Sequence, residues 1–271
     1  MFNELRKIGV FVKRDFRMLF TYKLAFLMSF LSIIFNLLYM VLFGSMFGSS
    51  SLPALSQYGG DFISYIIIGS MGWGFLWSIL NTTAFSLRTE MMMGTLESIL
   101  LTPTKMYTMM IAYTLFGCFF GLVSLVIVLL IGLFAFGVDA FATANVFTLI
   151  IFILSLLMMM GFGMIFSGLT IWVKNIGETI PLFQGIALFF CGVYFPISVL
   201  PSYLQPVSRF ISFYYSIEGL RQSLMVSNLT SELLGYMLIL LILAVGFIAI
   251  GLFVLHKGLI KAKKDGSLAF Y

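Results

Sequence analysis

The chain is divided by one short polar-edged segment, Glu90-Met-Met-Met-Gly94-Thr95-Leu96-Glu97-Ser-Ile-Leu100-Leu101-Thr102-Pro103, which stands between two long uncharged stretches. Arg88 and Lys105 flank this segment. A charged side chain at the centre of a bilayer costs about 2.5–3.5 kcal/mol on insertion scales, so we expect both glutamates to lie in water. The pattern therefore predicts a water-exposed helix, residues 88–103, between two membrane spans.

The composition of the whole chain agrees with a membrane protein. Of the 271 residues 61% are hydrophobic and 9% are charged, with a mean hydropathy of +1.12, which leaves too little polar surface to cover a soluble globule. The apolar stretches are long and unbroken, unlike the alternating segments of about ten residues found in membrane barrels. We predict an all-α integral membrane protein with a single transmembrane domain, residues 1–271. Cys118 and Cys191 lie in apolar stretches, so no disulfide is expected.

Residues 1–23 are basic and amphipathic. On a helical wheel, apolar side chains share one arc and most of the basic ones occupy the neighbouring arc. This pattern favours an interfacial helix on the cytoplasmic leaflet that sets the angle of the first span. A basic, solvated tail is the alternative. The apolar arc contains Phe2, Leu5, Ile8, Val12, Phe16 and Leu19.

The uncharged stretches that follow are long enough to cross a hydrocarbon core about 30 Å thick. Proline interrupts the fifth of them, and a straight helix does not tolerate proline in its interior. We therefore predict that residues 195–215 form a re-entrant cap on the external side, too short to cross again. The six predicted transmembrane helices are 24–47, 62–87, 106–138, 140–173, 179–195 and 233–255.

The distribution of basic residues orients these spans. With both termini in the cytoplasm, 13 of the 15 Lys and Arg residues face the cytoplasm, and only Arg209 and Arg221 are external. The positive-inside rule favours this orientation in the cytoplasmic (inner) cell membrane. The net charge of +5 therefore needs no nucleic-acid partner to explain it.

The sequence lacks the usual signatures of an energy-coupling enzyme. It contains no G-x-x-x-x-G-K-[ST] phosphate loop, no C-x-x-C pair and a single histidine, so no metal site is predicted. No Asp, Glu, Lys or Arg was expected well inside a span, where ion-coupled carriers usually keep one. We expect a transport subunit that is not an enzyme by itself. A self-sufficient secondary carrier or channel is the less favoured alternative.

Two motifs resemble those of ABC type-2 transporter permeases. The segment Glu90–Pro103 is similar to the family's E-x-x-x-G-T-L-E-x-L-L-x-[ST]-P signature between spans 2 and 3. Phe195-Pro196-Ile-Ser198-Val-Leu200-Pro201, continued by Tyr215-Ser-Ile-Glu218-Gly219-Leu220-Arg221, resembles the family's segment between spans 5 and 6. One departure is Ser212, where the family commonly has proline. The six-span layout covers the whole chain.

The resemblance implies a half-transporter. Two permease chains, expected to be a homodimer in membrane lipid, dock on two separate ABC ATPase subunits, which bind the ATP and Mg, so that this chain holds no cofactor. Residues 88–103 would then be a cytoplasmic coupling helix. If the segment is one helix, Glu90 and Glu97 share a face, and Thr102 caps the next helix with Pro103 at its first position. The expected ATPase-coupling residues are Glu90, Met93, Gly94, Thr95, Leu96, Glu97, Leu100, Thr102 and Pro103.

The resemblance also indicates a cap and a path. The expected substrate is a hydrophobic or amphipathic compound, drug-like or lipid, moved outward; a polysaccharide or lipid-linked glycan is the alternative. The expected cap or gate residues are Phe195, Pro196, Leu200, Pro201, Tyr215, Glu218 and Arg221. The path candidates along spans 1, 2 and 5 are Phe75, Trp77, Asn81, Gln184 and Phe189.

Overall fold

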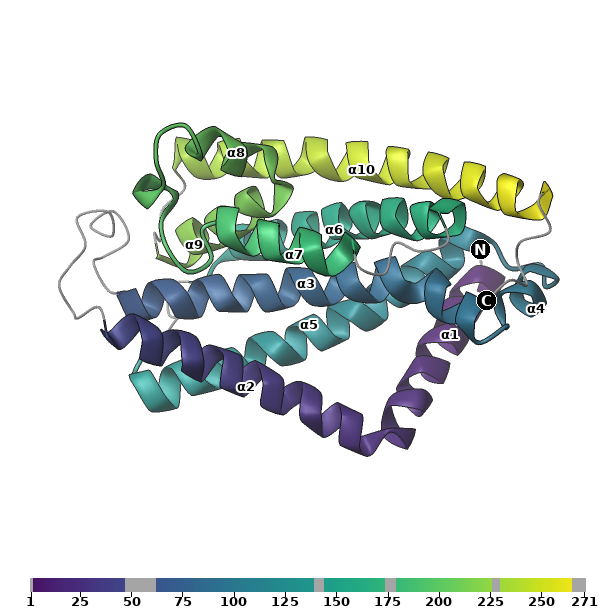
Figure 1. Ribbon diagram of the computed structural model, residues 1–271, viewed down its shortest axis with the longest axis horizontal. Helices are drawn as coiled ribbons and strands as arrows, with labels where there is room; N and C mark the ends of the chain where they lie inside the picture. Colours follow the sequence, from purple (N-terminus) through teal and green to yellow (C-terminus); the bar gives the residue numbers. More distant parts are fainter. Residues whose placement is uncertain (1, 47–61, 139–143, 174–178, 226–229, 265–271) are drawn as a thin grey trace.

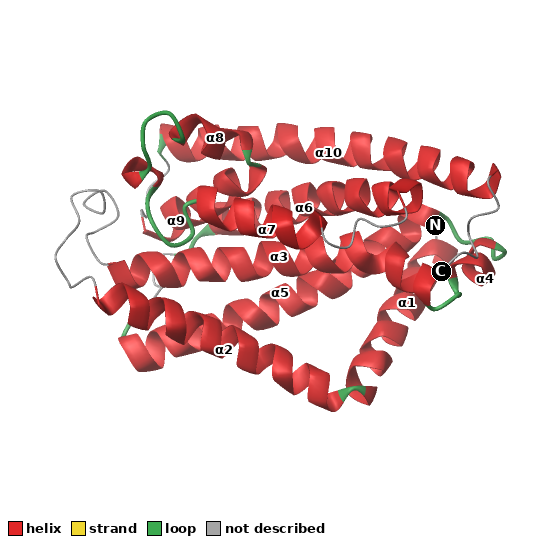
Figure 2. Ribbon diagram, viewed as in Figure 1, coloured by secondary structure: helices red, strands yellow, loops and turns green. Residues whose placement is uncertain are grey.

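The computed structural model describes residues 2–46, 62–138, 144–173, 179–225 and 230–264, and these residues form helices joined by turns (Figures 1 and 2). The predicted loop at 48–61, the turn around Asp139 and the connection at 174–178 lie wholly or almost wholly outside this part of the chain. In chain order the elements are α1 (Phe2–Thr21), α2 (Lys23–Met46), α3 (Phe62–Met92), α4 (Leu96–Leu100), α5 (Met106–Phe136), α6 (Val146–Val173), α7 (Thr179–Phe190), the 3-10 helix η2 (Ile197–Val199), α8 (Gln205–Phe210), α9 (Ser212–Met225) and α10 (Ser231–Lys264).

Four of the described helices, α3, α5, α6 and α10, are long and apolar enough to cross a membrane. A fifth span is counted if α1 and α2 are taken together; their axes differ by 83°. Helix α7 has only 12 residues and ends at Phe190, before the predicted end at residue 195. The chain is thus a multi-pass, all-helical membrane protein, and the six-span count remains a proposal.

Two helices extend past their predicted ends. Helix α3 continues from the predicted end at residue 87 to Met92, and α10 continues from residue 255 to Lys264. Charged residues mark where a helix leaves the apolar core, but Arg, Glu and Lys are good helix formers and do not end a helix. The predicted bounds are those of membrane spans, and these two helices continue beyond them.

Local signals explain several of the observed boundaries. The backbone N–H of Thr148 donates to Asn145 Oδ1 at 3.1 Å, so Asn145 caps the start of α6. Thr230 Oγ1 accepts from the Leu233 N–H at 3.2 Å at the start of α10. Gly137 ends α5 with a φ of +69°, a left-handed conformation that glycine adopts without strain.

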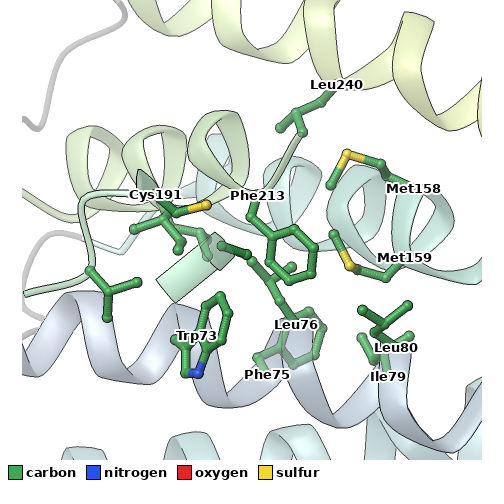
Figure 3. Close-up of a cluster of buried hydrophobic side chains, with 14 of the residues drawn as sticks. Trp73, Phe75, Leu76, Ile79, Leu80, Met158, Met159, Cys191, Phe213 and Leu240 are labelled. Carbon is green, nitrogen blue, oxygen red and sulfur yellow. The ribbon is translucent and has the colours of Figure 1, made fainter. Parts of the chain in front are cut away.

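Helix α3 is the centre of the molecule. In its apolar stretch 67% of the residues are buried within the chain, against 22% for α10, most of which is exposed. Helix α3 packs against α2, α5, α6 and α9, and Figure 1 shows it running between them. Side chains of α3 meet Met158 and Met159 of α6, Phe213 of α9 and Leu240 of α10 in one apolar cluster (Figure 3).

Helices α6 and α10 pack closely along glycines. A Cβ atom on Gly251 would lie 2.7 Å from the backbone oxygen of Gly161, and one on Gly258 would lie 2.9 Å from that of Gly168. Such distances leave no room for a side chain, so the two backbones approach each other directly, as small residues allow in membranes.

This packing predicts a selective effect of substitution on α10. We expect Gly251→Leu to destabilise the chain by about 1–3 kcal/mol through overpacking against α6. Gly246→Leu is the matched control, because a Cβ atom there meets nothing within 4 Å. Thermal unfolding in detergent should show a lower Tm for the first variant alone. Equal Tm values would contradict the close packing.

Candidate functional site

The predicted coupling segment is not one helix. Helix α3 ends at Met92, Gly94 has a φ of +67°, and α4 occupies only Leu96–Leu100. Glu90 therefore lies on α3 and Glu97 on α4, and the prediction that both share one helical face is wrong. The left-handed turn at Gly94 separates them, and glycine is the residue that adopts this conformation at least cost.

Helix α4 is anchored by the buried Leu96, with Ile99 and Leu100 partly buried against the same cluster, and it exposes Glu97 and Ser98. Leu96 is fully buried in a cluster with Leu87 of α3 and Met109 of α5, whereas Glu97 is exposed. Met93 and Leu101 are also exposed, the latter by 85%. Figure 1 places α4 at the same end of the molecule as the start of α1 and the end of α10. This end thus presents a carboxylate beside exposed apolar side chains.

Glu90 is buried, contrary to the expectation that it lies in water. Only 3% of the residue is exposed. Its Oε1 atom accepts from the hydroxyl of Tyr113 on α5, and its Oε2 atom accepts from Thr95 Oγ1 just before α4. Arg14 Nη2 of α1 lies 2.6 Å from Glu90 Oε1. The carboxylate therefore joins α1, α3, α5 and the turn leading to α4.

Arg14 is the cation of this junction. Its Nη2 atom donates to Tyr113 Oη and to Asp15 Oδ1, each at 2.9 Å. Its guanidinium also lies 5.2 Å from the ring centroid of Phe11. Burial raises the pKa of the Asp15 carboxyl above its usual value, and the neighbouring Arg14 opposes that shift. We call Arg14, Asp15, Glu90 and Tyr113 the polar junction.

A second set of contacts joins α1 to the far end of the same segment. Lys7 Nζ donates to the backbone oxygen of Pro103 at 2.5 Å and to Glu4 Oε1 at 2.8 Å. Thr108 Oγ1 of α5 donates to Glu4 Oε2 at 2.6 Å. The hydrogen bonds from Lys7 and Thr108 hold the pKa of the Glu4 carboxyl below its usual value. Helix α1 thus holds the chain on both sides of α4.

The predicted cap of the following helix is wrong. Thr102 Oγ1 donates to the backbone oxygen of Ile99 at 2.6 Å, which closes the turn after α4. The N-cap position of α5 is Lys105, and the helix begins at Met106, so Pro103 lies in the turn and not at a first helical position. Thr102 lies three residues before that N-cap position, and its hydroxyl contacts Ile99 and Thr104 and not the first turn of α5.

A groove separates α1 from α4. Its volume is about 620 Å³, and its walls are Arg6, Lys7 and Arg14 on one side and Ser98 and Ile99 on the other. The α1 wall also contains the apolar Val10 and Phe11, so the groove offers a basic and apolar wall against a polar and apolar one. Of the predicted coupling residues Thr95 and Thr102 also border it.

The predicted external cap consists of short helices at the opposite end of the molecule from α4 (Figure 1). Residues Phe195, Pro196, Leu200 and Pro201 lie around η2, with Pro201 exposed and Leu200 buried. Tyr215 belongs to α9, and its hydroxyl donates to the backbone oxygen of Arg209 at 2.8 Å. Glu218 and Arg221 also belong to α9 and not to a loop.

Arg221, which the sequence places on the external side, is fully buried. Its Nη1 atom donates to Glu218 Oε2 and its Nη2 atom to the backbone oxygen of Gly192, both at 2.9 Å. The guanidinium lies 3.7 Å from the ring centroid of Tyr65, whose hydroxyl donates to the same carbonyl at 2.8 Å. Gly69 allows this approach, because a Cβ there would lie 2.9 Å from Arg221 Nη2. Arg221 therefore ties α9 to α3 and to the turn after α7.

The five path candidates do not meet at one place. Phe75 is buried against Phe152 of α6, with ring centroids 4.9 Å apart. Trp77 stacks on Trp73, with ring centroids 6.0 Å apart. Asn81 lines a cavity beside the polar junction. Phe189 is half exposed and contacts Phe195. Gln184 lies partly exposed on α7.

The sequence reasoning missed Arg14, Asp15 and Tyr113. It considered only the apolar arc, which it placed on the membrane leaflet, and Leu5 of that arc is 60% exposed. The face that contacts α5 and the coupling segment carries Glu4, Lys7 and Phe11 as well as Arg14. The spacing 4, 7, 11, 14 is itself helical and places these residues on one face, which is the signal in the sequence for a packing face.

Comparison with known proteins gives one family. The chain matches the ABC-2 type transporter family over residues 6–225, which includes α1, the coupling segment and the cap. No curated protein matches the sequence. Because the match covers well over half of its residues, the chain belongs to the ABC-2 type transporter family.

Proposed function

We propose that this chain is the permease subunit of an ABC exporter that moves a hydrophobic or amphipathic compound outward across the cytoplasmic membrane. ATP is hydrolysed, with Mg, by a separate ATPase subunit, and the permease works as a homodimer. The observation that carries the proposal is the exposed α4, which contacts from α1 and α5 hold at one end of the molecule. Membership of the ABC-2 type transporter family supports it.

The surface around α4 suits a protein partner. Exposed Met92, Met93 and Leu101 would bury apolar area on docking, and the basic groove between α1 and α4 would accept an acidic or polar helix end. Glu97 would pair with a basic residue of the partner. Fixed contacts from α1 on both sides of α4 would carry a displacement of the docked subunit into α3 and α5.

Docking should depend on Glu97 and on the turn at Gly94. We expect Glu97→Ala to weaken binding of the ATPase about ten- to hundredfold, the equivalent of about 1.5–3 kcal/mol for a lost charge-assisted contact. Gly94→Leu should weaken it too, because leucine strains a positive φ and obstructs close approach, whereas Gly94→Asn should keep the turn. Copurification of an ATP-hydrolysing subunit from native membranes is the measurement.

The control is Glu232→Ala, which removes an exposed glutamate from the start of α10, at the opposite end of the molecule. That variant should copurify with the ATPase as the wild type does. If Glu97→Ala and Gly94→Leu do so as well, α4 is not the docking element and the proposed function loses its basis.

The proposed orientation predicts where introduced cysteines are accessible. With Cys118 and Cys191 replaced by alanine, a cysteine at Tyr203, which is 76% exposed, should react with an impermeant maleimide from outside the cell. A cysteine at the exposed Lys263 should react only after the membrane is opened. Reaction of both from the same side would contradict the six-span topology with cytoplasmic termini.

A further inference from the structure

A cavity of about 560 Å³ lies in the corner between α1 and α2, where these helices pack on α3 and α5. It is separate from the groove that faces α4. The corner exists because the axes of α1 and α2 differ by 83°. A volume of this size falls within the range of small-molecule binding sites, about 300–1,000 Å³.

One end of the cavity is apolar and aromatic. Phe26 of α2 and Phe116 and Phe120 of α5 line it, and their rings contact each other edge to face, with centroids 6.3 Å apart for Phe26 and Phe120 and 5.1 Å apart for Phe116 and Phe120. Met18 of α1 adds a flexible apolar side chain. This end suits an alkyl chain or a lipophilic ring.

The other end carries an excess of negative charge. The charged side chains among the described residues that line the cavity are Arg14, Asp15 and Glu90, which amounts to one cation against two carboxylates. The single guanidinium is shared, at 2.6 Å from Glu90 and 2.9 Å from Asp15. The cavity therefore attracts a second cation.

Asp15 also has an unused acceptor. Its side chain is 9% exposed, and its Oδ2 atom is buried without a hydrogen-bond donor from the described protein. A buried carboxylate oxygen without a donor is costly, because burial removes its hydrogen bonds to water. An N–H donor that carries positive charge would satisfy both the acceptor and the charge.

We propose that this cavity binds an amphiphile with a protonated amine head, its ammonium group donating to Asp15 and its apolar part lying against Phe26, Phe116 and Phe120. The ammonium group could come from phosphatidylethanolamine in the membrane or from a free lipophilic amine. Binding is a property of this chain alone and does not depend on an ATPase.

Two probes separate these sources. Octylamine is water-soluble and cationic at pH 7, and octanol is its uncharged counterpart. Binding of each compound is measured by isothermal titration to the purified chain in phosphatidylcholine nanodiscs. Native mass spectrometry of the same chain, with phosphatidylethanolamine and phosphatidylglycerol offered in equal amounts, reports which lipid is retained.

The variants remove either end of the site. Asp15→Asn keeps the shape and removes the charge, and it should weaken octylamine binding by about tenfold or more. Ser29→Phe fills the cavity from α2 and should abolish binding, whereas Ser32→Phe, on the same helix outside the cavity, should leave it unchanged. Unfolding temperatures of all three identify a variant that fails to fold.

The possible results distinguish a bound lipid, a bound free amine and the absence of a site. Retention of phosphatidylethanolamine by the wild type and its loss in Asp15→Asn identifies a lipid, and binding of octylamine without lipid retention identifies a free amine; either supports the site. Equal binding of octylamine and octanol, unchanged binding in Asp15→Asn, or no binding of either probe overturns it.

Discussion

Replacing Arg221 with methionine is expected to lower the free energy of unfolding by about 3–5 kcal/mol, because it leaves the buried Glu218 carboxylate without its cation. At about 2–4 °C per kcal/mol for a chain of this size, Tm should fall by about 6–20 °C. The substitution also removes a donor to the Gly192 carbonyl and the cation over the Tyr65 ring. Scanning fluorimetry in detergent measures the shift.

Two further variants isolate the cause. Arg209→Met removes an exposed cation from α8 and should leave Tm within about a degree of the wild type, since exposed substitutions change stability little. The double variant Glu218→Met/Arg221→Met removes both charges together, and it should recover most of the loss, because an apolar pair of similar volume avoids the desolvation cost. A double variant as unstable as Arg221→Met alone would show that the ion pair is not the cause.

Breaking the polar junction is the second large effect that we expect. Glu90→Gln removes the negative charge that Arg14 faces, while the amide oxygen can still accept from Tyr113. Arg14 is partly exposed, so solvent reduces the value of the pair, and we expect a coupling energy of about 1–3 kcal/mol. A double-mutant cycle of Glu90→Gln with Arg14→Met, followed by thermal unfolding, measures it.

The polar junction should matter more for transmitting the motion of the ATPase to the spans than for binding the ATPase. Glu90 is buried and lies outside the exposed surface of α4, and of the junction only Arg14 borders the groove between α1 and α4, so Glu90→Gln should still copurify with the ATPase while ATP hydrolysis no longer responds to the permease. Arg17→Met, which removes an exposed cation one turn further along α1, is the control. A coupling energy near zero together with normal response would contradict the proposed role of the junction.

Apolar stretches predicted the fold class and the long helices, because uncharged runs of this length have few alternatives in a membrane. Helices α3 and α10 continue past the predicted ends of their spans, since charge does not end a helix. The turn at Gly94 was missed because the segment was read as one helix, although glycine favours a left-handed turn there.

Contacts between distant parts of the chain could not be predicted from the sequence pattern. The sequence predicts Glu90 in water because an isolated charged side chain is not buried, and it places Arg221 on the external side without indicating that its side chain is buried. The partners of Glu90 come from other helices, Arg14 from α1 and Tyr113 from α5. Arg221 pairs with Glu218 of its own helix, and its second partner, the Gly192 carbonyl, comes from the turn after α7. Only the packing of α1 against α5 shows that the polar side of α1 faces inward.

The most direct test of the account is a distance measurement across the molecule. Spin labels at Phe20, on the exposed side of α1, and at Tyr203, in the cap, report whether movement at the cytoplasmic end reaches the external end. In the complex with an ATPase that binds ATP without hydrolysing it, we expect the distance between the labels to change on addition of ATP. In Glu90→Gln the complex should stay intact and the change should disappear. If ATP changes the distance between the labels in Glu90→Gln as it does in the wild type, the claim that the polar junction carries the motion of the ATPase into the spans is contradicted.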